Sequence, residues 1–205
     1  MTDDEKVLKG KIALVTGGAA GIGKAVAIAF ATAGAKVVVN DRNADQLNAT
    51  VKEICDAGGE AIAVPGDVGK TADIEALINT IRDSYGKLHF ACNNAGYNGD
   101  VIQLAEGSEK NFDAVFQTNV KGVWLCMKHE IPLMIEGSGG SIVNIASTAG
   151  VNGFPGLSVY CATKHAVIGM SKAAALDYAD QGIRINVVAP GAIETEWNVS
   201  KIRKY

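Results

Sequence analysis

The stretch that decides the fold is TGGAAGIG, residues 16–23. It follows the apolar run Lys11–Val15 and opens the segment Ile22–Ala33, where apolar residues recur at helical spacing. Glycines between a strand and a helix allow a tight turn and bring backbone N–H groups close to a phosphate at the positive end of the helix. The G-x-x-x-G-x-G spacing departs from the commonest dinucleotide fingerprint, and a glycine-rich turn without a ligand is the alternative. We interpret the stretch as the turn that binds the pyrophosphate of a dinucleotide.

Short β-branched runs alternate with longer helical patterns along the rest of the chain. Besides Lys11–Val15, the predicted strands are Lys36–Asn40, Ala61–Val64, Leu88–Cys92, Ser141–Ile145 and Ile183–Val188. Besides Ile22–Ala33, the predicted helices are Asn43–Ala57, Thr71–Tyr85, Glu109–Ile135 and Val159–Gln181. This alternation indicates an α/β fold with a doubly wound, Rossmann-like parallel sheet. No linker or change of composition divides residues 1–205, which we interpret as a single dinucleotide-binding and catalytic domain.

Composition excludes several classes of protein. Hydrophobic residues make up 48% of the chain and charged residues 20%, which is typical of globular domains and not of disordered chains. The net charge of −3 excludes a broadly cationic nucleic-acid binder. No apolar run reaches the roughly 18 residues that a membrane-spanning helix needs, so we expect no membrane partner.

The cysteines and the N-terminus indicate the compartment. The acidic start MTDDEK is the reverse of a signal peptide. Cys55, Cys92, Cys126 and Cys161 form no C-x-x-C pair, so we expect no metal site. We interpret the four as reduced thiols and the protein as cytoplasmic.

Asp41 follows the second predicted strand, 18 residues beyond Gly23. A carboxylate at this position accepts hydrogen bonds from the adenosine ribose hydroxyls and repels a 2′-phosphate. A helix N-cap or a turn acid is the alternative. Arg42 offers a positive charge for such a phosphate, whereas Ala20, just before Gly21, offers none. We therefore predict NAD as the cofactor in preference to NADP.

Tyr160 and Lys164 are four residues apart, which places a phenol and an ammonium on one face of a predicted helix. A cation beside a phenol lowers the pKa of the phenol and prepares it for general acid/base catalysis. So short a pattern also arises by chance. Ser147 lies 13 residues upstream, just past the fifth predicted strand and thus at the sheet edge where ligands bind in such folds. The three residues together predict a catalytic site.

From about Lys9 to its end, the sequence resembles the short-chain dehydrogenase/reductase family. The matching positions, in chain order, are residues 16–23, Asp67, Val68, Asn93, Asn94, Ala95, Gly96, Asn119, Ser147, Tyr160, Lys164, Pro190, Gly191 and Thr195. Matches so numerous and in the right order exceed what chance produces. The resemblance implies an NAD(P)-dependent enzyme that transfers a hydride between a nicotinamide cofactor and a secondary alcohol or ketone.

The resemblance assigns catalytic roles to four residues. Tyr160 would protonate or deprotonate the substrate oxygen, and Ser147 would orient that oxygen through a hydrogen bond. Lys164 would lower the pKa of Tyr160 and bind the nicotinamide ribose. Asn119 would anchor a water molecule that relays protons from Lys164.

The resemblance also implies a set of cofactor-binding residues. Asp67 would accept a hydrogen bond from the adenine amino group, with Val68 beside it. Ile193 and Thr195 would hold the nicotinamide carboxamide. The full implied set is Gly17, Gly21, Ile22, Gly23, Asp41, Asp67, Val68, Asn94, Ala95, Gly96, Tyr160, Lys164, Ile193 and Thr195.

Several of these positions also have a structural interpretation. Asn119 suits a helix cap or a bend, and Thr195 suits an ordinary loop. We expect Asn93 to tie neighbouring strands together rather than to bind a ligand. Outside the pattern, we interpret as packing or surface residues His89, His129, His165 and Cys161, and as core or subunit interface Trp124 and Met127.

In this family the chain normally continues through a substrate-covering segment, a further helix and a seventh strand. The present sequence ends at Tyr205, so we expect the C-terminal helix and seventh strand to be missing and strand six to be an exposed edge. An incomplete sequence and a truncated form both remain open. The two long helices are apolar on more than one face, and with the resemblance this predicts a homodimer or homotetramer.

Two classes of function follow. The first is hydride transfer between a nicotinamide cofactor and a secondary alcohol or ketone, the substrate being a sugar, a cyclic alcohol, a steroid-like polycycle or a 3-oxoacyl thioester. The second is a dinucleotide-binding regulatory or assembly subunit without turnover. The complete set of Ser147, Tyr160 and Lys164 favours the enzyme.

Overall fold

The computed structural model describes residues 6–195, and these form one parallel sheet of six strands with helices on its faces. The strands are β1 (Ile12–Thr16), β2 (Lys36–Asp41), β3 (Glu60–Pro65), β4 (Phe90–Asn93), β5 (Gly140–Ile145) and β6 (Ile183–Val188). The helices are α1 (Gly21–Thr32), α2 (Ala44–Asp56), α3 (Thr71–Tyr85), α4 (Glu109–Phe116), α5 (Gly122–Glu136) and α6 (Ser158–Asp177). Shorter turns are η2 (Leu104–Glu106), the π-helical η3 (Gln117–Lys121), η4 (Thr148–Gly150) and η5 (Ala179–Gln181).

The order of the strands places a crevice at the centre of the sheet. The order is β3-β2-β1-β4-β5-β6, so the chain moves outward from β1 to β3, returns to β4 and moves outward again to β6. β1 and β4 are parallel neighbours, with Thr16 beside Asn93 in the register. Because the loops after these two strands lead to opposite halves of the sheet, a ligand crevice opens between them. This topology confirms the predicted doubly wound, Rossmann-like sheet.

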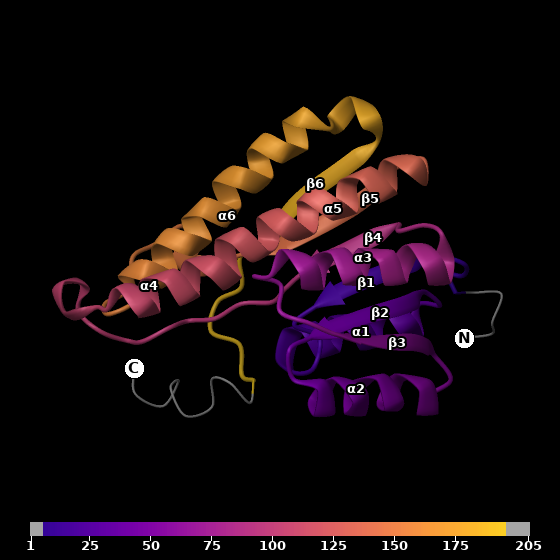
Figure 1. The fold of residues 1–205 in the computed structure, drawn as a ribbon, viewed down its shortest axis with the longest axis horizontal. Coiled ribbons are helices and arrows are strands. Elements are labelled where there is room, and N and C mark those ends of the chain that lie inside the picture. The colour runs from indigo at the N-terminus through magenta and orange to yellow at the C-terminus, as the bar shows by residue number, and fades with distance from the viewer. Residues whose placement is uncertain (1–5, 196–205) are drawn as a thin grey trace.

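Each face of the sheet has its own hydrophobic core. Helices α3, α5 and α6 cover one face, where Leu77, Leu125 and Val167 pack against the strands. Helices α1 and α2 cover the other face over β1 to β3, with Ala27 and Leu47 in the second core (Figure 1). Strand side chains alternate between the two cores, which explains why the strands read as nearly continuous apolar runs.

Two helices differ from the prediction. The helix expected over Glu109–Ile135 is continuous from Glu109 to Glu136, but the π-helical turn η3 lies within it between α4 and α5 and adds about one residue per turn. The helix expected over Val159–Gln181 ends at Asp177 and continues as the short turn η5. There Gly182, with a φ of 72°, turns the chain into β6.

The helical face formed by α4, α5 and α6 leaves large apolar side chains at the surface. Phe112 and Trp124 are 46% and 45% exposed, and Leu176 is 82% exposed. Met127, by contrast, is buried in the core. Within residues 6–195 the structure contains no helix with the length and apolar character needed to cross a membrane.

Candidate active site

A pocket of about 530 Å³ lies at the carboxyl ends of the strands, at the switch point between β1 and β4. The glycine turn, the loops after β2, β4 and β5, and the start of α6 contribute its walls. The predicted residues that line it are Gly17, Gly21, Ile22, Asp41, Asn94, Ala95, Gly96, Ser147, Tyr160, Lys164, Ile193 and Thr195. Asp67 and Val68 line a smaller hollow that shares Asp41 and Gly96 with this pocket. The fold thus gathers at one edge residues that are widely separated in the sequence.

The glycine turn is shaped by close backbone contacts. Gly17 and Gly21 have φ angles of 63° and 55°, which glycine adopts without strain. Gly23 does not line the pocket; a Cβ atom there would lie 2.1 Å from the carbonyl oxygen of Gly17. The Nδ2 atom of Asn94 donates to the carbonyl oxygens of Thr16 at 3.1 Å and of Gly17 at 2.9 Å. The turn is therefore held between the start of α1 and the end of β4.

The N-terminus of α1 suits the phosphates of a dinucleotide. No side chain caps this helix, because the N-cap residue is Ala20. Gly21 and Ile22 in its first turn line the pocket. Free N–H groups at the positive end of a helix bind anions, so the residues present fit the pyrophosphate of a nicotinamide dinucleotide.

Asp41 presents an oriented carboxylate at the junction of the two hollows. Its Oδ2 atom accepts a hydrogen bond from the backbone N–H of Ala19 at 3.2 Å, and its Oδ1 atom accepts one from Asn43 at 3.0 Å. Asn43, not Asp41, is the N-cap of α2. Asp41 is therefore not the helix cap that the sequence offered as an alternative, but it does stabilise the turn before α2.

The three catalytic candidates meet at the other end of the pocket. Ser147 follows β5, and its Oγ atom accepts a hydrogen bond from Ala149 N–H at 3.1 Å. Lys164, which is 3% exposed, donates from Nζ to the carbonyl oxygen of Ile145 at 2.8 Å. The same Nζ atom lies 5.6 Å from the ring centroid of Tyr160. The predicted helical spacing thus brings the phenol and the ammonium to one side of α6.

Burial dominates the electrostatics of this cluster. It raises the pKa of Tyr160 above its ordinary value, and a hydrogen bond with Ser147 partly opposes that effect. Burial also lowers the pKa of Lys164 to about 8. The sequence predicts that Lys164 lowers the pKa of Tyr160, whereas burial raises that pKa and the ammonium bonds to the carbonyl oxygen of Ile145. Ser147 is the group that favours the phenolate here.

Asn119 lies behind the pocket rather than in its wall. It is fully buried in η3, where its Oδ1 atom accepts from Tyr97 N–H at 2.7 Å and its Nδ2 atom donates to Tyr97 O at 2.8 Å. The Nδ2 atom also lies 3.1 Å from the Oγ1 atom of Thr163, which donates to the carbonyl oxygen of Tyr160 at 2.7 Å. The side chain of Asn119 therefore joins the loop after β4 to the catalytic helix.

Sequence reasoning did not identify several lining residues. Phe154 and Leu157, in the segment between Ser147 and Tyr160, line the pocket, and so does Asn98 after β4. The signal that could have found them is their position, because a segment flanked by two site residues must pass along the site. The expected start of the substrate cover, residues 196–205, lies outside the described residues.

Asn93, His89 and His165 have structural partners, whereas the buried Nε2 atom of His129 has none among the described residues. Asn93 bonds to Asn144 on the neighbouring strand β5, as expected for a residue that ties strands together. His89 accepts a hydrogen bond from Ile12 N–H, and His165 bonds to the carbonyl oxygen of Cys161. In the part of the chain that the structure describes, no three His, Cys, Asp or Glu side chains are placed to hold a metal ion.

Comparison with known proteins identifies relatives over nearly the whole chain. The family model described as short chain dehydrogenase matches residues 11–205. A cyclohexanol dehydrogenase from Acinetobacter sp. (strain SE19) is 43% identical over 185 residues, which cover 90% of this chain and 74% of that protein. A 3-oxoacyl-[acyl-carrier-protein] reductase from Synechocystis sp. (strain ATCC 27184 / PCC 6803 / Kazusa) is 42% identical over 190 residues, 92% of this chain and 76% of the relative.

A similar solved structure is a short chain dehydrogenase/reductase from Burkholderia phymatum in complex with NAD. Its TM-score is 0.89 at 32% sequence identity, and the match covers 92% of this chain and 68% of that one. The likeness therefore extends to the arrangement of the sheet and helices around the pocket.

The close contact at Gly23 generates a first prediction. In Gly23→Ala, the Cβ atom would meet the carbonyl oxygen of Gly17 at 2.1 Å, so the turn or α1 must shift. We expect a loss of about 1–3 kcal/mol of stability, measured by urea or thermal unfolding. The matched control is Gly169→Ala, in the interior of α6, where a Cβ atom meets no other atom within 4 Å. The control should be neutral or stabilising, and equal stability of the two variants would contradict the prediction.

Proposed function

This chain belongs to the short-chain dehydrogenase family, and from that premise we propose that it uses NAD to interconvert a compact cyclic secondary alcohol and its ketone. Family membership makes it an oxidoreductase that acts on alcohols or ketones with a nicotinamide cofactor. We propose, beyond family membership, that the cofactor is NAD, that the substrate is cyclic and that individual residues have the roles given below.

The observation that carries the proposal is the shared pocket. Ser147, Tyr160 and Lys164 line the same cavity as the glycine turn and Asp41. A subunit that only bound a dinucleotide would need the turn and the ribose carboxylate, but not a half-buried phenol beside a serine hydroxyl. The complete set therefore favours turnover over the alternative of a non-catalytic binding subunit.

The chemistry of the pocket follows from these groups. When bound, the nicotinamide ring supplies the acceptor or donor of the hydride. In the oxidation of an alcohol, Tyr160 acts as general base toward the substrate hydroxyl; in the reduction of a ketone, it acts as general acid toward the carbonyl oxygen. Ser147 donates a hydrogen bond to the same oxygen and orients it. Lys164 would bind the nicotinamide ribose from its place beside Tyr160, where its ammonium also donates to the carbonyl oxygen of Ile145.

Asp41 supports NAD as the cofactor. Its two oxygens are oriented by backbone N–H groups of Ala19 and Asn43, and its carboxylate lies at the junction of the two hollows. A carboxylate held in this way accepts hydrogen bonds from ribose hydroxyls and repels a 2′-phosphate. Arg42, also in the lining, is the residue that would act against this preference.

The lining of the catalytic end supports a compact, apolar substrate. Phe154 and Leu157 present apolar surface there, and Lys164 is the charged residue at that end among the described lining residues. An alicyclic ring buries its carbon atoms against such side chains, whereas a sugar would leave several hydroxyls without partners. The similarity to a cyclohexanol dehydrogenase agrees with this choice.

The exposed apolar face of α4, α5 and α6 supports a homodimer. Trp124 and Leu176 lie on α5 and α6, whose other faces pack against the sheet, and Phe112 lies on α4, which packs against α6. A partner surface is needed to bury these three side chains. A second copy of this chain, related by a two-fold axis, would offer the same apolar face.

We also propose a cytoplasmic location, because all four cysteines are unpaired.

The role of Tyr160 is tested by Tyr160→Phe. The variant should lose about 10²- to 10⁴-fold in kcat, because the acid/base group is removed while the ring still packs. The affinity for NAD should change little. The measurement is absorbance of the reduced nicotinamide with cyclohexanol, a sugar alcohol and a 3-hydroxyacyl thioester as substrates. Lys164→Ala should reduce both turnover and cofactor binding.

Three outcomes of this assay are informative. Full activity of Tyr160→Phe would remove Tyr160 from the mechanism. Turnover of the sugar alcohol or the thioester in preference to cyclohexanol would overturn the cyclic substrate. Cofactor binding by the wild type without turnover of any substrate would favour the non-catalytic subunit.

The cofactor preference is tested by titrating NAD and NADP. We expect NAD to bind about 10- to 100-fold more tightly, because NADP loses the ribose contact and gains charge repulsion at Asp41. Asp41→Asn should narrow the difference in affinity between NAD and NADP. Asp45 is an exposed acid in the first turn of α2, and Asp45→Asn should leave this difference unchanged. Equal affinities in the wild type, or tighter binding of NADP, would contradict the assignment.

The homodimer is tested by light scattering. The 205-residue chain should be at least dimeric, and Trp124→Glu should shift it toward monomer by placing a charge on the apolar helical face. The control is Leu104→Glu, which lies on η2 outside the three helices and is 75% exposed. A monomeric wild type, or an equal effect of both substitutions, would argue against this face as the interface.

A further inference from the structure

A buried polar cluster lies directly beneath the catalytic edge of the sheet. It joins Asn93 on β4, Glu130 on α5, Asn144 on β5 and Ser171 on α6, each at most 1% exposed. The Nδ2 atom of Asn93 donates to Glu130 Oε2 at 3.0 Å and to Asn144 Oδ1 at 2.9 Å. The Nδ2 atom of Asn144 lies 2.8 Å from the Oγ atom of Ser171. The cluster therefore connects two central strands to the two helices that cover them.

Two acceptor atoms in this cluster have no partner. They are Oδ1 of Asn93 and Oε1 of Glu130, both fully buried. A buried acceptor without a hydrogen bond destabilises the fold, so native structures rarely leave two in one cluster. Both atoms belong to side chains that are already joined by one hydrogen bond. A proton on Oε1 would turn one of the two acceptors into a donor for the other.

The surroundings of Glu130 favour the protonated carboxyl. Burial raises its pKa to about 7, and the hydrogen bond from the neutral amide of Asn93 opposes this only in part. The ionisable groups coupled to it are Cys92 on β4 and Cys126 on α5, and burial raises the pKa of both thiols. The residues that β5 and α6 contribute to the cluster, Asn144 and Ser171, are uncharged.

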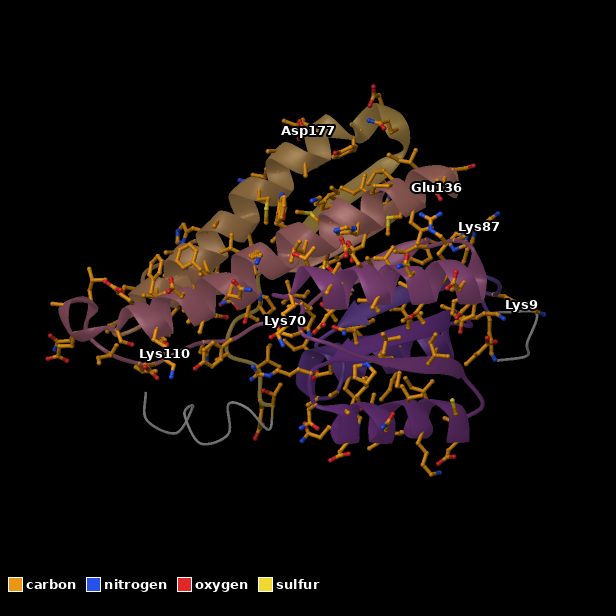
Figure 2. The ribbon with its side chains drawn as sticks, viewed as in Figure 1. Lys9, Lys70, Lys87, Lys110, Glu136 and Asp177 are labelled. Carbon is orange, nitrogen blue, oxygen red and sulfur yellow. The ribbon has the colours of Figure 1, made fainter. Side chains whose placement is uncertain are left out.

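Helix α3 packs against α5, and its Arg82 side chain bonds to a residue of α5. Arg82 pairs with Glu136, at the exposed C-terminal end of α5 (Figure 2). The described contacts therefore give Glu130 no cation to neutralise a buried carboxylate, and the neutral acid is the form that the site can accommodate.

Two residues of the cluster are followed directly in the sequence by residues whose contacts shape the active site. Asn93 is followed by Asn94, whose side chain holds the carbonyl oxygens of the glycine turn. Asn144 is followed by Ile145, whose carbonyl oxygen accepts the hydrogen bond from Lys164. A shift of either strand end would therefore move the cofactor turn or the catalytic ammonium.

We propose that Glu130 is a positioning residue: as a neutral carboxylic acid it donates its proton to Oδ1 of Asn93 and thereby fixes the carboxyl ends of β4 and β5. Glu130 touches neither substrate nor cofactor. It acts through Asn93 and Asn144 on the neighbouring residues of the site. Loss of the proton leaves an unpaired buried charge facing an amide oxygen, and the two strand ends lose their common tie.

The sign of the pH dependence follows from linkage. The carboxyl has its ordinary pKa of 4.5 in the unfolded chain and about 7 in the folded protein, so the folded protein binds more protons between these values. The contribution of Glu130 to stability is therefore fully present below pH 4.5, declines as the pH rises toward 7 and is lost above it. The corresponding change in the unfolding equilibrium constant is on the order of 100-fold.

The test compares the wild type with Glu130→Gln. The amide of glutamine can donate and accept as the neutral acid does, so the variant should fold and remain active near pH 6. The pH-dependent loss of stability attributed to Glu130 should be absent from the variant. Between pH 6 and pH 9, kcat of the wild type should fall several-fold relative to that of the variant. Identical pH profiles of stability and kcat would overturn the proposal.

The matched control is Glu136→Gln on the same helix. Glu136 is solvent-exposed and ion-paired, and its pKa is lowered by Arg82, so its substitution should not remove the decline of stability toward pH 7. If Glu136→Gln removes that decline, Glu130 is not its source and the proposal fails.

Infrared spectroscopy of the wild type tests the proton directly and needs neither substrate nor cofactor. With ¹³C-labelled glutamate, the carbonyl stretch of a protonated carboxylic acid should be present at pH 6 and disappear by pH 9. All other glutamates in residues 6–195 are exposed, so the buried acid is the expected source of this band. Absence of the band at pH 6 would overturn the proposal even if Glu130→Gln failed to fold. A positive band with no turnover would leave the proposal standing and count against the proposed function alone.

Discussion

The fold depends on the close contact between the glycine turn and the end of β4. Asn94 donates from its side chain to the carbonyl oxygens of Thr16 and Gly17, while the Oγ1 atom of Thr16 accepts from the backbone N–H groups of Asn94 and Ala95. These bonds cross the boundary at which the strand order reverses. They hold the two halves of the sheet at a fixed separation, and the pocket lies in that gap.

Polar residues beneath and behind the pocket extend the same constraint. Asn119 joins the loop after β4 to Thr163 on α6, and Asn93 joins β4 to β5 and α5. Each is nearly inaccessible to solvent, so its hydrogen bonds form in a medium of low dielectric constant and resist exchange with water. The catalytic edge is therefore rigid because it rests on bonded side chains rather than on apolar packing alone.

Sequence reasoning predicted most of this architecture because its signals are local. Glycine spacing, apolar strands and the Tyr160–Lys164 interval all act within a few residues, and the structure places these elements where they were expected. The π turn at Asn119 was not visible, since the apolar periodicity runs on through it. The raised pKa of Tyr160 depends on burial, and the roles of Phe154 and Glu130 depend on neighbours distant in sequence. Short-range patterns carry no information on such contacts.

The hydrogen bond from Lys164 to the carbonyl oxygen of Ile145 has a consequence for the thermodynamics of binding. A lysine side chain loses roughly 2 kcal/mol of rotamer entropy when it is immobilised. Here that loss occurs when the chain folds, because the ammonium is buried and bonded to the backbone of β5. A ligand that arrives meets a cation of fixed position, so its affinity is not reduced by the ordering of this side chain. The loss of Lys164 rotamer entropy therefore lowers the stability of the fold and does not weaken the binding of the ligand.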